Sequence, residues 1–395
     1  MLTPASKEGH LSADRRLRRV QFVCDFYVSE VHAGVVDYAR AAGWSLYDKK
    51  CYVPALDYTE ECDGILAIAT MADLAAWLRA QSCPVVRLLC SDMELPFPAV
   101  EPDSVGIGAR GAEHFLSLGS PNCVFYTGWL TRETEAIWRG FSTTLAAAGK
   151  GARLVDFKAG CAGKETVTFS RQQRWDWLVE QLRVLPRPLA VFAEDDRFAN
   201  DLIVAAAQLG WRIPEDMAVL GADNRALILG KYPVPVSSVD TNLHGIGWAG
   251  GALLERILDG EKIPAVACSI APGPVVARRS TATFVCDHSG VTAAVNYLRA
   301  HFHEHLDLAA LVQAAAVSTR SLQSAFKEHL GHSVSDELSR VRLEHARRLL
   351  RETDLKLESV AHESGFGNAK YLCQVFRAAF GETPTGYRDG ARAKG

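Results

Sequence analysis

The chain has 395 residues, 48% of them hydrophobic and 23% charged, and its formal net charge is -3. A chain of this length is expected to form two or three domains with ordinary globular cores. The small negative charge excludes nucleic-acid binding through the field of the whole molecule, so any contact with DNA must come from a local basic face.

The N-terminus and the cysteines indicate the compartment. Residues 1–19 are polar, lack the apolar core of a secretory signal and are expected to form a flexible tail. No apolar run approaches the roughly 20 residues that a membrane-spanning helix needs, which argues against a membrane partner. The ten cysteines are scattered without a C-x-x-C pair. We therefore expect reduced thiols, no structural metal, and a cytoplasmic protein.

Residues 20–287 alternate short apolar runs with longer segments of helical periodicity. Continuous apolar strands that alternate with helices are typical of parallel sheets covered on both faces. For a segment of this size, two such sheets are expected rather than one. The predicted strands are Val20–Cys24, Gly64–Ile68, Val85–Leu89, Val124–Tyr126, Leu189–Phe192 and Ala218–Leu220. The predicted helices are Val31–Ala42, Ala72–Gln81, Arg110–Leu118, Thr134–Ala148, Arg174–Val184, Ala199–Leu209 and Ile246–Leu258.

Residues 288–395 show helical periodicity throughout and no strand pattern, and the polar stretch Cys286–Val291 marks the boundary. An internal repeat with a spacing of 50 residues relates Ser318–Gly331 to Asn368–Gly381. Each copy begins with a good N-cap residue, places its apolar residues on one helix face and ends at glycine. We therefore expect the same amphipathic helix twice.

The opposite face of each repeated helix carries long hydrogen-bond donors and amides, which suit base edges and phosphates. The alternative is an ordinary solvated face, which the repetition disfavours. Cys373 shares the second face but is not expected to contact a base. The predicted DNA-binding residues are Arg320, Gln323, Ser324 and Lys327 in the first copy, and Asn368, Lys370, Gln374 and Arg377 in the second.

A short helix precedes each repeat, at Leu308–Ala315 and at Leu357–Ser364, and a short turn leads into the repeated helix. Helix, short turn and helix is the signature of a helix-turn-helix unit. The helix predicted over Ser333–Arg351, with a capping box at its start, spans about 28 Å and is close to one DNA turn of about 34 Å. Both recognition helices are thus expected to enter successive major grooves. Pro384 is expected to stop the last helix.

The C-terminal module carries a set of short motifs: Arg342-Leu-Glu-His-Ala-Arg-Arg-Leu-Leu-Arg-Glu-Thr353, Val360-Ala361, Gly365-Phe366, Phe376-Arg377, Phe380-Gly-Glu-Thr-Pro384 and Tyr387-Arg388. With these motifs the module resembles the DNA-binding domain of AraC-type regulators. The resemblance implies two recognition helices in one monomeric unit, usually in an activator that contacts RNA polymerase.

Residues 20–287 contain the motifs Asp103-Ser-Val-Gly-Ile-Gly108, Trp138-Arg139-Gly140-Phe141, Val191-Phe-Ala-Glu-Asp-Asp196, Ile213-Pro-Glu-Asp216, Val219-Leu-Gly-Ala-Asp-Asn224 and Ser237-Ser-Val-Asp240. With these motifs and its order of segments, this region resembles the two-lobed α/β type-I periplasmic-binding-protein fold that LacI-type repressors use for effectors. LacI-type proteins carry their DNA reader at the N-terminus, whereas here an all-α AraC-type module at the other end replaces it. The combination is similar to the xylose-operon activator family. It implies a sugar-responsive homodimer that binds tandem or inverted half-sites on double-stranded DNA and activates pentose-utilisation genes.

A polar cleft is expected beyond the carboxyl ends of the parallel strands, where such sheets bind ligands. Carboxylates accept hydrogen bonds from sugar hydroxyls, arginine donates them, and aromatic rings stack on an apolar sugar face. Asp25 and Asp195 have helix capping as their alternative role, and the aromatic residues have packing as theirs. Arg139 is expected to open a helix. The predicted effector-binding residues are Asp223, Arg139, Asp195, Asp25, Phe26 and Trp129, and the first two match effector-binding positions of the resembling family.

No catalytic residue, cofactor or metal site is predicted. Gly106-Ile-Gly-Ala-Arg-Gly111 fits G-x-G-x-x-G, but no strand directly precedes it, so we interpret it as a helix start. A G-x-S-x-G elbow is absent, and the adjacent Asp195 and Asp196 are expected to point in different directions and not to form a glycosidase pair. Two alternatives stay open: a regulator of the same architecture that senses a purine, and a sugar-modifying enzyme fused to a DNA-binding domain.

Overall fold

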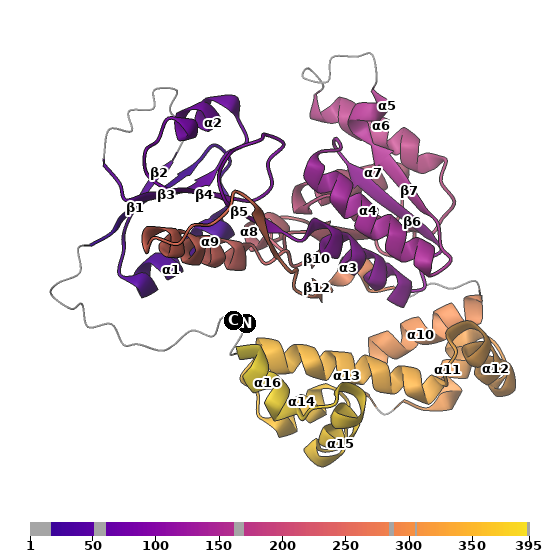
Figure 1. The fold of residues 1–395 in the computed structure, drawn as a ribbon. Coiled ribbons are helices and arrows are strands. Elements are labelled where there is room, and N and C mark those ends of the chain that lie inside the picture. Colours follow the sequence, from indigo (N-terminus) through magenta and orange to yellow (C-terminus); the bar gives the residue numbers. More distant parts are fainter. Residues whose placement is uncertain (1–16, 51–60, 162–169, 284–287, 305, 393–395) are drawn as a thin grey trace. The chain divides into compact units, whose positions relative to one another are not determined.

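The computed structural model describes residues 17–50, 61–161, 170–283, 288–304 and 306–392 (Figure 1). The chain divides into two compact units, residues 1–117 with 122–281 and residues 118–121 with 282–395. The predicted boundary between 287 and 288 adjoins 284–287, which lie outside the described residues, and it stays a prediction. Most of the predicted N-terminal tail lies outside them too. Among the described residues, no helix combines the length and apolar character of a membrane span.

The first unit contains two α/β lobes, and the first lobe is built on a six-stranded sheet (Figure 1). The strand order is β11-β5-β4-β3-β1-β2, and all neighbouring strands are parallel. The central strand β3 is buried along its whole length, as expected when helices cover both faces. The elements are β1 (Arg19–Cys24), α1 (Ser29–Ala42), β2 (Ser45–Lys50), β3 (Gly64–Ile68), α2 (Ala72–Arg79), β4 (Val85–Leu88), β5 (Ala99–Pro102), α9 (Leu243–Leu258) and β11 (Ala267–Ile270).

The second lobe repeats this plan with the strand order β12-β10-β9-β8-β6-β7. Its strands are parallel except for β12, which pairs antiparallel with β10. The elements are α3 (Ser104–Ser117), β6 (Asn122–Thr127), α4 (Arg132–Ala147), β7 (Ala152–Asp156), α5 (Phe157–Gly160), α6 (Arg171–Arg183), β8 (Leu189–Ala193), α7 (Asp196–Leu209), β9 (Met217–Ala222), α8 (Ala226–Leu229), β10 (Ser237–Val239) and β12 (Val275–Val276).

The prediction of two parallel sheets is confirmed, and each predicted strand is present within two residues of its expected bounds. The strands that the sequence did not reveal are of two kinds. Strands β2, β7, β11 and β12 lie at sheet edges, where partial exposure removes the continuous apolar run. The short inner strands β5 and β10 bury polar side chains, including Glu101 and Ser237.

The chain passes between the two lobes at three places: from β5 to α3, from β10 to α9, and from β11 to β12. Backbone hydrogen bonds tie these crossings to one another. Asp103 N donates to Ile270 O over 2.8 Å, and Gly273 N donates to Asp240 O, also over 2.8 Å. The two lobes are therefore joined by a bonded ribbon rather than by independent linkers.

The G-x-G-x-x-G motif lies inside α3, which begins at Ser104, before the predicted Arg110. A side chain at Gly108 would collide with the backbone carbonyl of Ile137 on α4. A side chain at Gly111 would meet the ring of Phe192 on β8, 2.6 Å away. The glycines thus allow α3 to lie close to α4 and to the sheet, and the interpretation as a helix start is confirmed.

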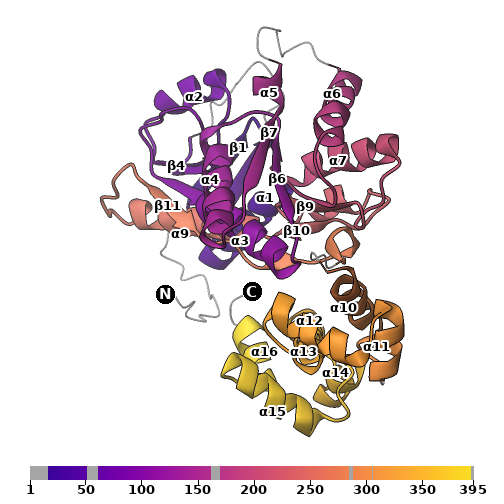
Figure 2. The same ribbon diagram turned by 90° about the vertical axis from the view of Figure 1, so that its right-hand side faces the viewer.

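The second unit consists of helices, as predicted (Figure 2). Its long helix α13 contributes Val334 and Leu338 to a core beneath α10–α12 and Leu343, Ala346 and Leu350 to a second core beneath α14 and α15. Each helix-turn-helix unit therefore has its own core. The elements are α10 (Ser289–His301), α11 (Leu308–Ala315), α12 (Thr319–Leu330), α13 (Val334–Glu352), α14 (Leu357–Glu363), α15 (Ala369–Phe380) and α16 (Pro384–Arg392).

The repeat is reproduced in the structure, because α12 and α15 each have 12 residues and occupy corresponding positions. Ser318 and Asn368 cap them, and each ends at a glycine in the left-handed region, with φ 74° at Gly331 and 77° at Gly381. The expected role of Pro384 was wrong. Gly381 already ends α15, and Pro384 is the first residue of α16, where its missing N–H costs nothing.

Candidate effector cleft and DNA-reading helices

Two of the predicted effector residues act as helix caps in this structure. The carboxylate of Asp25, directly after β1, accepts hydrogen bonds from Thr70 N, Thr70 Oγ1 and Met71 N at 2.7–2.9 Å, at the start of α2. Asp195 caps α7 by accepting from Arg197 N (2.6 Å) and Phe198 N (3.2 Å). The capping alternative therefore describes both residues, and neither lines the cavity described below.

Asp195 forms an ion pair with Arg197, whose Nε and Nη2 both donate to Oδ2, over 2.8 and 2.5 Å. The same guanidinium lies over the ring of Phe26, 5.0 Å from its centroid. Phe26 belongs to the first lobe and Arg197 to the second, so this cation–π contact crosses the cleft. Phe26 also packs against the core of its own lobe. Its position fits both a packing role and a place in the cleft wall.

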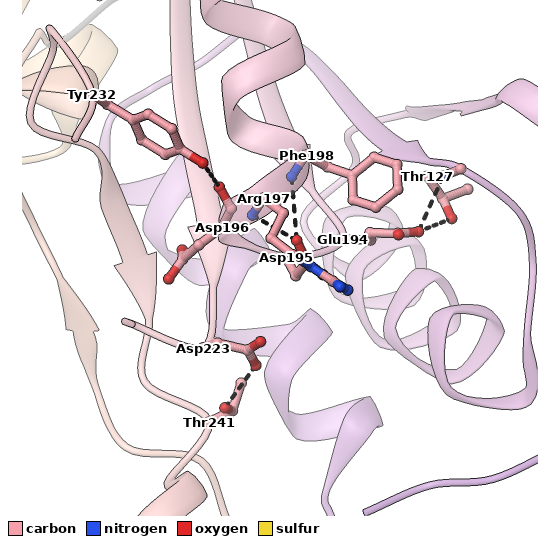
Figure 3. A network of polar contacts seen from close by, with 10 residues as sticks. Thr127, Glu194, Asp195, Asp196, Arg197, Phe198, Asp223, Tyr232 and Thr241 are labelled. Atoms are coloured by element: carbon pink, nitrogen blue, oxygen red, sulfur yellow. Dashed lines mark hydrogen bonds and ion pairs between the residues drawn. The ribbon is translucent and has the colours of Figure 1, made fainter. Parts of the chain in front are cut away.

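Asp223 occupies the carboxyl end of β9 in a strained backbone conformation, with φ 93°. Its backbone N donates to Val239 O (3.0 Å), and its Oδ1 accepts from Thr241 Oγ1 (3.0 Å). Burial and the neighbouring charge of Asp195 raise the pKa of this carboxyl to about 6. Figure 3 shows Asp195 and Asp223 among the polar groups near the ends of β8 and β9. A strained, half-buried carboxylate held by a single hydroxyl is a good hydrogen-bond acceptor for a ligand.

Glu133, in the first turn of α4, is the cleft residue that the sequence did not reveal. Burial, and after it the negative charges of Asp223 and Asp195, raise its pKa to about 7. The sequence feature that could have identified Glu133 is the capping box at Thr131. It starts α4 shortly after β6, so the first turn of α4 lies at the carboxyl end of the sheet.

A cavity of about 330 Å³ opens beside this first turn. Glu133 and Arg139 line it from the second lobe, and Glu101 and Ser269 line it from the first. A volume of this size suits a small polar molecule. Carboxylates and guanidinium groups face the cavity together, so it can both accept and donate charge-assisted hydrogen bonds.

The expectation that Arg139 opens a helix was wrong. Arg139 lies two turns inside α4 and is exposed, whereas Arg132 opens the helix. Arg132 donates to Glu101 of the first lobe over 2.6 Å, and its backbone N donates to Asp92 over 2.9 Å. The sequence predicted that this helix begins at Thr134, whereas the Thr131 cap starts it two residues earlier, at Arg132. Trp129, in the loop before α4, is 50% exposed and its ring is open to contact.

Two further carboxyl groups lie behind these strand ends, Asp196 fully buried and Glu194 half-buried. Glu194 accepts from Thr127 Oγ1 and from Gly128 N, and burial and Asp195 raise its pKa to about 8. Asp196 accepts from Ser238 Oγ (2.6 Å) and Arg225 N (2.7 Å), and burial and Asp223 raise its pKa to about 8. Their bonding is internal, so they support the strand ends rather than face a ligand. As predicted, Asp195 and Asp196 point in different directions.

The predicted DNA-binding side chains form one exposed face on each repeated helix. On α12, Arg320, Gln323, Ser324 and Lys327 are exposed, and on α15, Lys370, Gln374 and Arg377 are exposed. Cys373 is half-buried. Asn368 is engaged as a cap, since its Oδ1 accepts from Tyr371 N over 2.8 Å. Tyr371, 51% exposed on the same helix, is an additional candidate that the prediction did not include.

Comparisons with known proteins match both units. A periplasmic binding protein-like domain model matches residues 112–281, and a helix-turn-helix domain model matches residues 311–390. The xylose operon regulatory protein of Escherichia coli K12 is 25% identical over 382 residues, covering 92% of this chain and 94% of the relative. The activator RhaS of Salmonella arizonae is 29% identical over 46% of this chain and 68% of its own length.

Solved structures show the same fold. The structure of the xylose-binding transcription activator XylR aligns with a TM-score of 0.58 at 23% identity, covering 95% of this chain and 98% of that one. The transcriptional regulator CelR in complex with cellobiose aligns with a TM-score of 0.53 at 19% identity, covering 68% of this chain and 86% of that one.

The predicted fold class and the joining of the two modules in this order are thus confirmed. The relatives are transcription regulators and not enzymes. The chain is therefore a transcription regulator in which an effector domain like that of xylose operon regulatory proteins is fused to an AraC-type helix-turn-helix domain.

Proposed function

We propose that this regulator responds to a neutral sugar, a pentose of the xylose type, and activates genes for its use. The observation that carries the proposal is the set of carboxylates at the carboxyl ends of the second lobe's strands: Asp195 follows β8, Asp223 follows β9, and Glu133 lies in the first turn of α4. Hydroxyl groups donate to carboxylates, so this set favours a polyhydroxylated ligand. The names of the relatives support the same class, since they regulate a xylose operon and one of them binds xylose.

The effector would bind between the lobes and draw them together. Asp223, Glu133 and Asp195 would contact it from the second lobe, with Arg139 at the cavity wall and Trp129 and Phe26 beside a sugar face. Asp25 would act indirectly, by holding the start of α2. A ligand shifts a conformational equilibrium only if it binds one state more tightly. Closure around the sugar would supply that difference.

The DNA-binding domain would read two successive major grooves with α12 and α15. Their exposed donors and amides support this role. We further propose a cytoplasmic, nucleoid-associated homodimer that binds two sets of tandem or inverted half-sites and contacts RNA polymerase. This part rests on the resemblance to AraC-type and xylose-operon regulators.

Ligand titration tests the sugar proposal. All eight tryptophans precede residue 282, so tryptophan fluorescence reports on the effector domain alone. A panel of D-xylose, other pentoses, hexoses and purines would be titrated, with thermal unfolding as a second reading. A ligand at 100 times its Kd stabilises the domain by about 2.7 kcal/mol. We expect one pentose to respond; a response to a purine alone would overturn the sugar assignment.

Asp223→Asn tests the residue assignment. It should abolish the response to the sugar and leave basal DNA binding intact. Asp216→Asn is the matched control, because Asp216 precedes the opposite end of the same strand and bonds to Arg212 and Arg187. Loss of basal DNA binding in Asp223→Asn would contradict the assignment.

Arg320→Ala tests direct base reading by α12. It should weaken binding to the selected operator more than binding to random DNA, because base contacts specify and phosphate contacts do not. Equal weakening on both DNAs would reduce Arg320 to a phosphate contact.

A further inference from the structure

The seam between the two helix-turn-helix units is occupied by one arginine on the helix that joins them. Arg342 follows Leu338, which packs in the first core, and precedes Leu343, which packs in the second. Its Nε donates to Phe302 O over 2.8 Å, and its Nη2 donates to Glu304 O over 2.9 Å. Both carbonyls belong to the connection between α10 and α11. Arg342 therefore binds, through two hydrogen bonds, the segment that leads into the first helix-turn-helix unit.

The turn of the second helix-turn-helix unit packs against the same connection between α10 and α11. Gly365, between α14 and α15, has φ 72°. A side chain there would collide with Phe302 O and lie 2.8 Å from Arg342 Nε and 3.0 Å from the Cα of His303. Only glycine permits this approach in this backbone conformation. The turn of the second unit thus packs backbone to backbone on the lead-in segment of the first, with the Arg342 guanidinium beside both.

Neighbouring side chains complete the junction. His345, one turn further along α13, lies with its Nδ1 3.2 Å from Ser364 Oγ, and Ser364 is fully buried. The rings of His345 and Phe302 have centroids 4.7 Å apart. The lead-in of the first unit, the joining helix and the turn of the second unit therefore meet at one point.

We propose that Arg342 is a positioning residue that fixes the spacing and angle between α12 and α15, and hence the spacing of the two DNA segments that the chain reads. This inference rests on the proposed DNA reading. A single helix such as α13 fixes the distance between two units that pack along it but restrains rotation about its axis less. The junction lies off that axis and supplies the missing restraint.

The chemistry favours arginine at this position. The guanidinium presents several donors in a rigid fork, so it can bond to two carbonyls at once. A lysine ammonium carries no such fork. We call the two hydrogen bonds from Arg342 to the carbonyls of Phe302 and Glu304 the clamp. Arg342→Lys should keep the positive charge and weaken the clamp, so this variant separates a positioning role from an effect of charge alone.

The experiment selects binding sequences from a duplex with a long randomised centre, using the full chain. Wild type is expected to enrich two conserved blocks at one spacing. Arg342→Ala, and less so Arg342→Lys, should enrich the same blocks at several spacings. Affinity for the wild-type sequence should fall about tenfold or more, since bonds to charged groups contribute about 1.5–3 kcal/mol.

Gly365→Ala perturbs the same junction from the other side and should broaden the spacing in the same way. Gly381→Ala is its control, because Gly381 shares the left-handed backbone, with φ 77°, but among the described residues no atom lies within 4 Å of the position that a Cβ would take. Arg348→Ala, on the exposed side of α13, controls for the loss of a basic charge. Thermal unfolding of every variant separates misplacement of the helices from loss of folding.

The outcomes separate the two proposals. Two blocks at one spacing for wild type and at several for Arg342→Ala would establish the clamp. One unchanged spacing in folded Arg342→Ala and Gly365→Ala would overturn the clamp and keep the DNA reading. No enriched sequence for wild type would overturn the proposed DNA reading and the clamp with it.

Discussion

Glu30 on α1 and Arg225 before α8 form an ion pair across the two lobes, with Arg225 Nε 3.4 Å from a Glu30 carboxylate oxygen. Both side chains are largely shielded, with exposed fractions of 29% and 13%. The backbone N of Arg225 also bonds to the buried Asp196. The pair thus connects the first lobe to the strand end that carries Asp223.

Removing this ion pair should weaken effector binding, although neither residue is proposed to contact the effector. We expect Glu30→Gln to lower effector affinity about threefold, because a partly exposed ion pair contributes about 0.2–1 kcal/mol. Isothermal titration with the effector found in the panel measures the change. Asp37→Asn is the control, since Asp37 lies on the same helix but bonds to His244 of its own lobe. Equal affinities for wild type and Glu30→Gln would show that the pair does not support the bound state.

The raised carboxyl pKa values predict that the effector domain is more stable in mild acid than in mild base. The pKa values of Asp223, Glu133, Glu194 and Asp196 are raised to about 6, 7, 8 and 8, each first by burial. Unfolded carboxyl groups titrate near 4, so the folded domain holds more protons between pH 5 and 8. Stability therefore falls as pH rises through the folded pKa values.

Thermal unfolding followed by tryptophan fluorescence checks this dependence. We expect the unfolding temperature of the effector domain to drop between pH 5.5 and 8.5. Glu194→Gln should flatten the drop, because glutamine keeps the shape of the side chain and does not titrate. A stability that rises over this range would contradict the raised pKa values of these four groups.

The close packing of α3 on α4 predicts a severe effect of a single methyl group. Gly108→Ala should destabilise the effector domain by about 1–3 kcal/mol, since the new Cβ meets the Ile137 carbonyl and backbone must shift. Gly151→Ala, in the same lobe with nothing within 4 Å, should change stability by about 0.5 kcal/mol or less. Urea unfolding of the two variants compares them directly. Similar values for both would mean that α3 and α4 do not pack this closely.

The exposed basic residues of the reading helices predict the salt dependence of DNA binding. Lys327→Ala should reduce the slope of log affinity against log salt by about 1, because each phosphate contact releases about one counterion. Fluorescence anisotropy at several salt concentrations gives the slope. Arg183→Ala, an exposed arginine on α6 paired with Glu180, should leave it unchanged. A slope equal to that of wild type in Lys327→Ala would remove Lys327 from the phosphate contacts.

The sequence predicted best where one periodicity dominated. The buried strand β3 has its predicted bounds, and α12 and α15 begin directly after their predicted caps. The edge strand β11 was not predicted because its side chains are mostly exposed and have no apolar pattern. Pro384 was misjudged because proline both follows helix ends and opens helices, and only the preceding Gly381 decides between the two.

The cleft was harder to predict, because its residues come from distant parts of the chain. Asp223 was identified from its place after a strand, whereas Glu133 looks like an ordinary acidic residue in a first helical turn. Its character arises from burial beside Asp223 and Asp195, which no local pattern encodes. For Asp25 and Asp195, the bonding partners Thr70 and Phe198 decide that they cap helices.

The bonded crossings at Asp103–Ile270 and Gly273–Asp240 limit how the lobes of the effector domain can move. A single linker would allow one lobe to swivel, slide and tilt over the other. Three crossings fastened side by side resist swivelling and sliding, because either motion would shear their hydrogen bonds. Tilting across the ribbon remains as the one soft degree of freedom. The proposed closure around an effector would therefore be a defined rotation, which is the kind of motion that can be passed on as an unambiguous signal.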